Sequence, residues 1–310
     1  MLSLASIDIG SNTIRLLIGR AERNRIVRLR CEMVITRLAE GIAETGLLKT
    51  ENAEKSVSVL KEFSRLISTY NVSHIKAIGT SAVREAKNSE EFIQRVLSET
   101  GIKIEIVPGK KEAELTARGV VLGMSRSDLA LIVDIGGGST EWILCENSSP
   151  IKVGTIPTGV VKLFENHIKS DPPSRGDIGS LNKEAEAVSG RLKAEIGHLI
   201  NSNTVFIGTA GTVTTLASID LGLETYNHEE IHMHNMPLQR LCDISERLIN
   251  VPLSERKKLR GLEPERADLI IPGILFTINI MELFGFKDIL VSDNGLLEGI
   301  LVRLSEEVSH

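Results

Sequence analysis

Two stretches of this sequence repeat the same plan, and they constrain the fold more than any other feature. Residues 8–18 read DIGSNTIRLLI and residues 134–144 read DIGGGSTEWIL, so each has an Asp-Ile-Gly, a turn of small residues and an apolar strand pattern. Because an apolar run also precedes each aspartate, each stretch is predicted to be a hairpin of two β-strands. A duplicated hairpin predicts two similar half-molecules that face one another. In the overlay, Asp8 falls on Asp134, Gly10 on Gly136 and Arg15 on Glu141.

Apolar runs of strand length alternate with helical patterns along nearly the whole chain of 310 residues, which is typical of an α/β fold. This length allows two domains of ordinary size. We expect the first domain to span residues 1–117, together with a C-terminal helix at 297–310, and the second to span 118–296. Helical patterns cover, among others, residues 110–124, 174–201, 237–250 and 264–283, and Ser174 is placed to cap the second of these.

Composition excludes several classes of protein. Hydrophobic residues are 42%, charged residues 25% and the net charge is -5, which fits a soluble globular protein and gives no sign of nucleic-acid binding. The most apolar late segment, residues 269–281, is too short and too interrupted to span a bilayer. The first residues, MLSLASIDIG, have no basic region and do not resemble a signal peptide. Cys31, Cys145 and Cys242 form no CxxC motif, which argues against structural zinc, and we expect a cytoplasmic protein.

The turn of the second hairpin is typical of a phosphate site. Its successive glycines let an anion approach backbone N–H groups without meeting a Cβ: Gly136, Gly137 and Gly138. Ser139 and Thr140 add hydroxyl donors, and Asp134 could hold a divalent cation such as Mg²⁺. The alternative is a glycine-rich hairpin whose aspartate caps its own turn. The repeated Asp-x-Gly turn favours phosphate, and it extends the prediction to Gly10, Ser11, Asn12 and Thr13.

A third small-residue loop, GTAGTVT at residues 208–214, follows a strand and precedes a helix. Free N–H groups and the helix dipole point outward together in such a loop, which favours an anion. Its candidate phosphate contacts are Gly208, Thr209, Gly211 and Thr212. A tight strand-to-helix connection would need the same small residues for packing, and the sequence alone leaves both interpretations open.

One further loop, IGTSAVREAKN at residues 78–88, carries a cation. Arg84 could clamp a phosphoryl group through two N–H donors. The alternative is an exposed arginine paired with Glu85 or with a helix C-terminus.

Hydrolysis of a phosphoanhydride needs a group that orients or deprotonates water. The candidate carboxylates are Glu141, which starts the strand after the triple glycine, and Glu112 and Glu114 at the start of a predicted helix. Acidic residues near a helix N-terminus are favoured by the dipole in any case and are often only solvated. The residues alone do not choose between Glu112 and Glu114.

Together these motifs resemble the exopolyphosphatase and guanosine pentaphosphate phosphohydrolase family, part of the superfamily of actin, sugar kinases and chaperone ATPases. They occur in the family's order from Asp8 to Leu301. The motifs are DIGSNTIRLLI, GTSAVREAKN, GKKEAELTARGV, VDIGGGSTE, DPP, GTAGTVTTLA, ERADLIIPG and VSDNGLLEGIL. The resemblance implies two actin-like, ribonuclease H-like α/β domains with a central cleft, in the short form of the family.

The resemblance also implies a role for each matching residue. Glu112 matches the proposed general base, and Glu141 the second essential glutamate. Asp134 matches the metal-binding aspartate, while Ser139 and Arg84 match phosphate contacts. The expected reaction is hydrolysis of the terminal phosphoanhydride of inorganic polyphosphate with Mg²⁺ or another divalent cation.

Two other activities fit the same residues. The first is 5′-phosphohydrolysis of guanosine pentaphosphate, and the second is a non-hydrolytic sensor that binds guanosine penta- or tetraphosphate. A kinase of the same superfamily would further need an acceptor site. A homodimer is compatible with each of them, and neither nucleic acid nor a membrane is an expected partner.

Two positions depart from the family pattern. Lys111 stands where relatives usually have glutamate, and Leu297 stands where they often have arginine. The missing arginine bears on nucleotide substrates more than on the phosphatase chemistry. Basic residues that a long polyanion could contact, or that simply form a solvated helix face, are Lys110, Lys111, Arg256, Lys257, Lys258 and Arg260.

Overall fold

The computed structural model describes residues 2–22, 25–122 and 129–308. The chain divides into two compact units, and the first comprises residues 1–124, 153–155 and 294–310. The second comprises residues 125–152 and 156–293. The sequence predicted a domain boundary between residues 117 and 118. Helix α5 (Gly109–Val120) continues across that position and lies wholly in the first unit, so the two units do not divide there.

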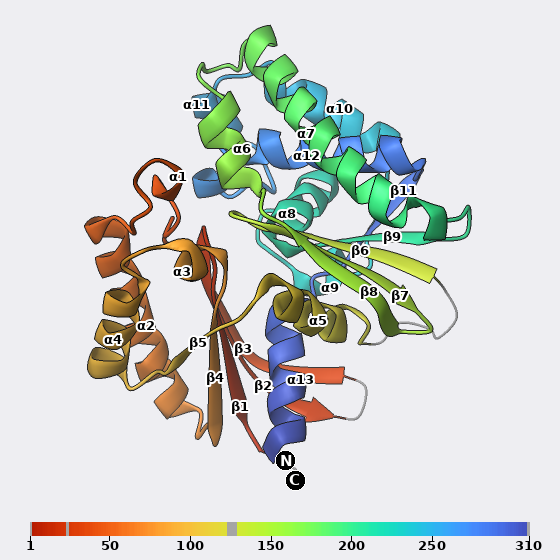
Figure 1. Ribbon diagram of the computed structural model, residues 1–310. Helices are drawn as coiled ribbons and strands as arrows, with labels where there is room; N and C mark the ends of the chain where they lie inside the picture. The colour runs from red at the N-terminus through yellow and green to blue at the C-terminus, as the bar shows by residue number, and fades with distance from the viewer. Residues whose placement is uncertain (1, 23–24, 123–128, 309–310) are drawn as a thin grey trace. The chain divides into compact units, whose positions relative to one another are not determined.

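The first unit is built on a five-stranded mixed sheet of order β3-β2-β1-β4-β5. Its first three strands pair antiparallel, while β1 with β4 and β4 with β5 pair parallel. The central strand β1 is buried at every position, because helices cover both faces of the sheet (Figure 1). The strands are β1 (Leu4–Ile9), β2 (Thr13–Glu22), β3 (Arg25–Ile35), β4 (His74–Gly79) and β5 (Ile104–Ile106).

Two groups of helices pack on this sheet. On one face, α2 and α4 bury Leu60, Phe63 and Val96 in the larger core cluster of the unit. On the other face, α13 contributes Leu297 and Leu301 to a smaller cluster with β1 and β2. The helices of this unit are α1 (Ile42–Thr45), α2 (Thr50–Thr69), α3 (Ser81–Glu85), α4 (Ser89–Thr100), α5 and α13 (Leu296–Val308).

Helices α5 and α13 approach each other through glycines. A Cβ built on Gly119 would lie 1.9 Å from the carbonyl oxygen of Gly295, and one built on Gly299 would lie 1.7 Å from the carbonyl oxygen of Leu115. Any side chain at either position would therefore force the two helices apart. This contact places the C-terminal helix against the helix that carries Glu112.

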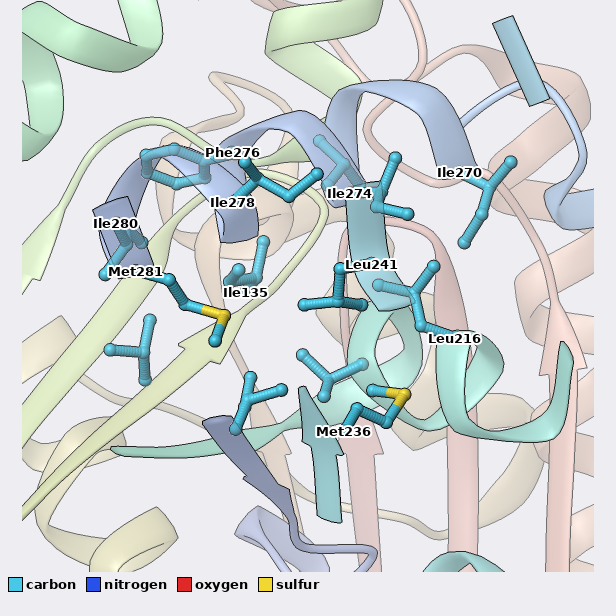
Figure 2. Packing of buried hydrophobic residues seen from close by; sticks show 14 of the residues in the cluster. Ile135, Leu216, Met236, Leu241, Ile270, Ile274, Phe276, Ile278, Ile280 and Met281 are labelled. Atoms are coloured by element: carbon cyan, nitrogen blue, oxygen red, sulfur yellow. The ribbon is translucent and has the colours of Figure 1, made fainter. Parts of the chain in front are cut away.

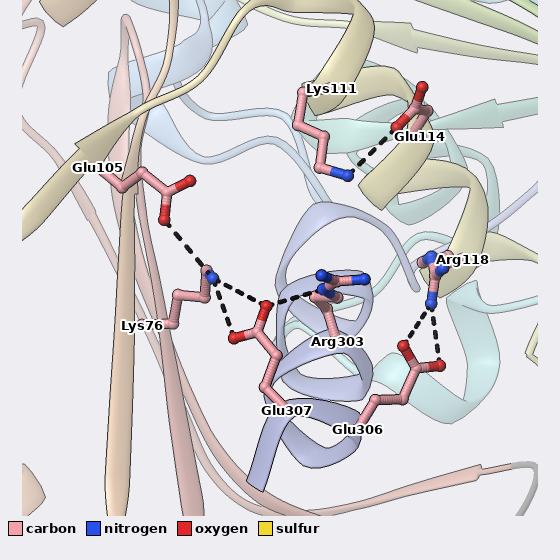
Figure 3. Close-up of polar contacts among 8 residues, drawn as sticks. All are labelled: Lys76, Glu105, Lys111, Glu114, Arg118, Arg303, Glu306 and Glu307. Atoms are coloured by element: carbon pink, nitrogen blue, oxygen red, sulfur yellow. Dashed lines mark hydrogen bonds and ion pairs between the residues drawn. The ribbon is translucent and has the colours of Figure 1, made fainter. Parts of the chain in front are cut away.

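Ion pairs at the solvent-facing end of α13 support the same arrangement (Figure 3). Arg118 on α5 pairs with Glu306 at 2.8 Å, and Glu307 pairs with Lys76 on β4 at 3.2 Å and with Arg303 at 2.7 Å. These side chains are partly exposed, so each pair contributes little energy and the apolar contacts dominate.

The second unit is built on a six-stranded sheet of order β10-β11-β9-β6-β7-β8. Strand β6 pairs antiparallel with β7 and parallel with β9, and it is buried from Ala130 to Ile135. The short strand β10 at the edge was not expected from the sequence. The strands are β6 (Leu129–Ile135), β7 (Thr140–Glu146), β8 (Ser149–Ile156), β9 (Val205–Thr209), β10 (Asn235–Pro237) and β11 (Asp288–Val291).

Helix α12 is the centre of the second core. Ten of its residues are buried, and Phe276, Ile280 and Met281 belong to one cluster with Ile135 of β6 and Leu241 of α10 (Figure 2). A helix that is apolar on most sides is one surrounded by other elements. The helices of this unit are α6 (Val160–His167), α7 (Arg175–Ile196), η1 (Gly197–Leu199), α8 (Ala210–Leu221), α9 (His228–Ile231), α10 (Leu238–Ile249), α11 (Leu253–Arg256), η2 (Pro264–Arg266) and α12 (Ile270–Phe284).

Within the described ranges, no helix combines the length and the apolar character needed to cross a membrane.

Candidate active site

The two Asp-Ile-Gly hairpins have the same backbone geometry. Asp8 lies opposite Arg15 in the β1–β2 register, and Asp134 lies opposite Glu141 in the β6–β7 register. In each turn the glycine N–H donates to the carbonyl oxygen three residues later, at 3.0 Å in both. The structure thus places the overlaid residues at equivalent positions of two equivalent turns.

The first hairpin holds several polar atoms without partners. Arg15 donates to one oxygen of Asp8 from both Nε (3.0 Å) and Nη2 (2.7 Å). The other oxygen, Asp8 Oδ1, is buried and accepts no hydrogen bond from any described residue, and the same holds for Ser11 Oγ and Asn12 Oδ1. Buried polar atoms without partners cost free energy, so their gathering at one turn points to a ligand that supplies the missing contacts.

The triple-glycine loop of the second hairpin uses its carbonyl groups internally. The carbonyl oxygens of Gly136 and Gly137 accept hydrogen bonds from Val160 (3.0 Å) and Val161 (2.9 Å) at the start of α6. In contrast, the N–H groups of Gly137, Gly138 and Ser139 donate to no group in the described part of the chain. Three successive N–H groups without acceptors are donors that a bound anion could use.

The carboxylates of this hairpin lie side by side on adjacent strands. Asp134 is 7% exposed and its neighbour across the ladder, Glu141, is 1% exposed. The described residues contain no cluster of three or more His, Cys, Asp or Glu that could hold a metal ion by themselves. Mg²⁺ is usually bound by one or two carboxylates together with water and phosphate oxygens, so this donor set fits Mg²⁺ that enters with a phosphate.

The third loop leads from β9 into α8, and its two glycines are close to different neighbours. A Cβ at Gly208 would lie 2.6 Å from Ile289, so this glycine is required for packing within the sheet. A Cβ at Gly211 would lie 1.9 Å from the guanidinium of Arg266, which therefore lies directly on the start of α8. Thr212 donates to the carbonyl oxygen of Ile135 at 3.3 Å. Arg266 belongs to the ERADLIIPG motif, but no local feature of the sequence marks it as a site residue.

Helix α5 distinguishes the two glutamates that the sequence left open. Glu112 is 7% exposed, and its Oε2 accepts a hydrogen bond from Arg84 Nη1 at 3.2 Å, while Arg84 also donates to the carbonyl oxygen of Val107 at 2.9 Å. The side chain of Glu114 is 40% exposed and pairs with Lys111 at 3.3 Å (Figure 3). The structure thus places Arg84 on Glu112, where both side chains are held in one orientation.

Two further positions have structural roles. Leu297 is buried with Leu4 and Leu17 of the first sheet, so this position faces the core. Arg256 was a candidate contact for a polyanion, but it is buried and pairs with Asp171 at 2.6 Å, which makes that prediction wrong for Arg256. Lys257 and Lys258 are exposed.

The predicted site residues fall into two sets, one in each unit. The first unit carries the β1–β2 turn, Arg84 and Glu112, and the second carries Asp134, Glu141 and the two glycine-rich loops.

Comparison with known proteins identifies a family and a fold. The model of the Ppx/GppA phosphatase family matches residues 18–308. A crystal structure of the Aquifex aeolicus member of that family has 30% sequence identity and a TM-score of 0.82, covering 100% of this chain and 99% of that one. The fold is therefore the actin-like two-domain α/β fold of these structures.

Three curated relatives illustrate the range of names among similar proteins. Exopolyphosphatase 2 of Mycobacterium tuberculosis is 29% identical, covering 97% of this chain and 98% of the relative. A bifunctional 3-dehydroquinate synthase/phosphatase of Fusobacterium nucleatum is 33% identical, and the chain spans 46% of its length. A guanosine-5'-triphosphate,3'-diphosphate pyrophosphatase of Vibrio atlanticus is 28% identical, and the chain spans 59% of its length.

Proposed function

Because the chain belongs to the Ppx/GppA phosphatase family, we propose that it removes the terminal phosphate of inorganic polyphosphate by metal-assisted hydrolysis and releases orthophosphate. The observation that carries this proposal is the triple-glycine loop, where the N–H groups of Gly137, Gly138 and Ser139 lie next to the carboxylates of Asp134 and Glu141. Donors for phosphate oxygens and ligands for a cation lie together on one hairpin, which is the inventory that phosphoryl transfer needs.

Each residue has a role in the proposed reaction. Asp134 would hold Mg²⁺, which when bound would offset the charge of the phosphate oxygens. The loop amides bind the terminal phosphate, and Arg84 stabilises the negative charge that develops on it. Glu112, held by Arg84 at 3.2 Å, orients or deprotonates the attacking water, and Glu141 helps to place water or metal. The β1–β2 turn (Gly10, Ser11, Asn12, Thr13) and the loop with Thr209, Gly211 and Thr212 supply further phosphate contacts.

A second substrate presents the same bond. The 5′ γ-phosphate of guanosine pentaphosphate is also a terminal anhydride, and the similarity to the Vibrio atlanticus pyrophosphatase supports it. Leu297 places an apolar side chain in the core where relatives often have arginine, so that position supplies no cation for a nucleotide. We therefore rank polyphosphate first. A sensor without hydrolysis is less favoured, because both glutamates are present and buried.

The three cysteines are free thiols, which supports a reducing cytoplasm as the proposed compartment. A homodimer stays a prediction.

Phosphate release with Mg²⁺ tests the proposal when long polyphosphate, short polyphosphate, guanosine pentaphosphate and ATP are compared side by side. We expect orthophosphate from polyphosphate at a higher kcat/KM than from the other three, and loss of release when EDTA removes the metal. A higher kcat/KM on guanosine pentaphosphate would make the nucleotide the substrate. Binding of either compound without any release would contradict hydrolysis and support the sensor.

A further inference from the structure

Three helices of the second unit line a cavity that is open to solvent and that the proposed reaction does not use. It has a volume of about 420 Å³ and lies between α7, α10 and α12. Its lining residues recur three or four positions apart on each helix, as with Ser245 and Ile249 on α10 or Leu275 and Asn279 on α12. One face of each helix therefore points into the cavity. A volume of this size is typical of a small-molecule site.

Polar groups without partners line the cavity. Ser245 is 4% exposed, and its hydroxyl forms no hydrogen bond with any residue that the structure describes. Asn279 Oδ1 is likewise buried without a donor. Buried polar atoms are nearly always paired in folded proteins, so the unpaired Asn279 Oδ1, in the same lining as the Ser245 hydroxyl, points to a ligand that donates hydrogen bonds.

Three exposed acidic residues also line the cavity. Glu186, Glu246 and Glu282 line it from α7, α10 and α12, and none of the three carboxylates pairs with a cation in the described chain. The lining includes no lysine or arginine. Burial raises the pKa of the Cys242 thiol in the same wall, and the negative charge of Glu282 raises it further, so this thiol stays protonated.

The carboxylates are too dispersed to share one ion. They form no cluster among the described residues that could hold a metal. Three separated negative charges around apolar side chains such as Leu275 instead match a ligand with separated positive charges on a hydrocarbon chain.

We propose that this cavity binds a linear aliphatic oligoamine. Its ammonium groups pair with Glu186, Glu246 and Glu282 and donate hydrogen bonds to Ser245 Oγ and Asn279 Oδ1, and its methylene segments pack on Leu275. The proposal does not depend on the identity of the phosphate substrate.

Isothermal titration calorimetry with spermidine and the full chain tests this, at low salt of about 20 mM because ion pairs at a partly open site are screened. We expect saturable binding of one spermidine per chain. Glu246→Gln and Glu282→Gln should each weaken it about threefold to tenfold. Ser245→Ala should also weaken it. The matched control is Glu184→Gln, which removes the same charge from α7 outside the cavity lining and should leave the affinity unchanged.

Three results would overturn the proposal. One is the absence of saturable spermidine binding to a wild-type protein that melts cooperatively. Another is an equal loss of affinity in Glu184→Gln and in the cavity variants, which would show diffuse attraction to a negative protein. Complete displacement of spermidine by equimolar Mg²⁺ would likewise contradict a site shaped for an aliphatic chain.

Discussion

Replacing Glu112 or Glu141 by glutamine is expected to lower the rate of orthophosphate release by about 10²–10⁴-fold, the range that general acid–base groups contribute. Glutamine keeps the shape of the side chain and one acceptor oxygen, but it cannot accept a proton or carry the charge. Glu112 is held by Arg84 at 3.2 Å and Glu141 lies opposite Asp134 on the neighbouring strand. Their loss should therefore lower kcat rather than the stability of the fold.

Glu114→Gln is the matched control for Glu112→Gln. Both residues lie in the first turns of α5, but Glu114 is partly exposed and pairs with Lys111 at the surface. Its variant should release phosphate at close to the wild-type rate. Equal rates for Glu112→Gln and Glu114→Gln would remove Glu112 from the mechanism. Melting curves of all three variants show whether a lost rate reflects chemistry or unfolding.

Gly119→Ala is expected to cause a large loss of stability. A methyl group there would lie 1.9 Å from the carbonyl oxygen of Gly295, so α13 would have to move away from α5. Overpacking of this kind usually costs 1–3 kcal/mol, and because the obstacle is backbone we expect at least about 2 kcal/mol. The free energy of unfolding in urea measures it.

Gly179→Ala is the control with the opposite expected sign. Gly179 lies within helix α7, and no other atom would lie within 4 Å of a Cβ built on it. Alanine should stabilise this helix by up to about 1 kcal/mol. A Gly119→Ala protein as stable as wild type would mean that α5 and α13 do not pack as described.

Local signals in the sequence predicted the hairpins and most helices. The aspartate, the glycine and the small residues of each turn fix its geometry, and Ser174 forms the capping box of α7 with Asp177. The pattern at 264–283 predicted one helix, whereas the chain forms η2 at Pro264–Arg266 and then α12 from Ile270. The apolar pattern does not mark that break, because Ala267 and Leu269 within it are as buried as Ile270 at the start of α12.

Tertiary contacts decided what the sequence left open at the site. Glu112 shares a helix face with Leu115 and Gly119, three and seven positions later, and that spacing alone could have favoured it over Glu114. Arg266 gave no such signal, because its contact with Gly211 joins residues far apart in the chain. Leu297 stood out only as a missing arginine until its burial showed it to be a core residue.

The most direct test of the central claim is to follow oxygen-18 from labelled water during a single turnover of polyphosphate with Mg²⁺. Attack of water on the terminal phosphorus breaks its bond to the bridging oxygen, which leaves with the shortened chain. We therefore expect one labelled oxygen in each released orthophosphate and none in the polyphosphate that remains. Label in the shortened chain, or cleavage into two polyphosphates without orthophosphate, would contradict terminal hydrolysis by this protein.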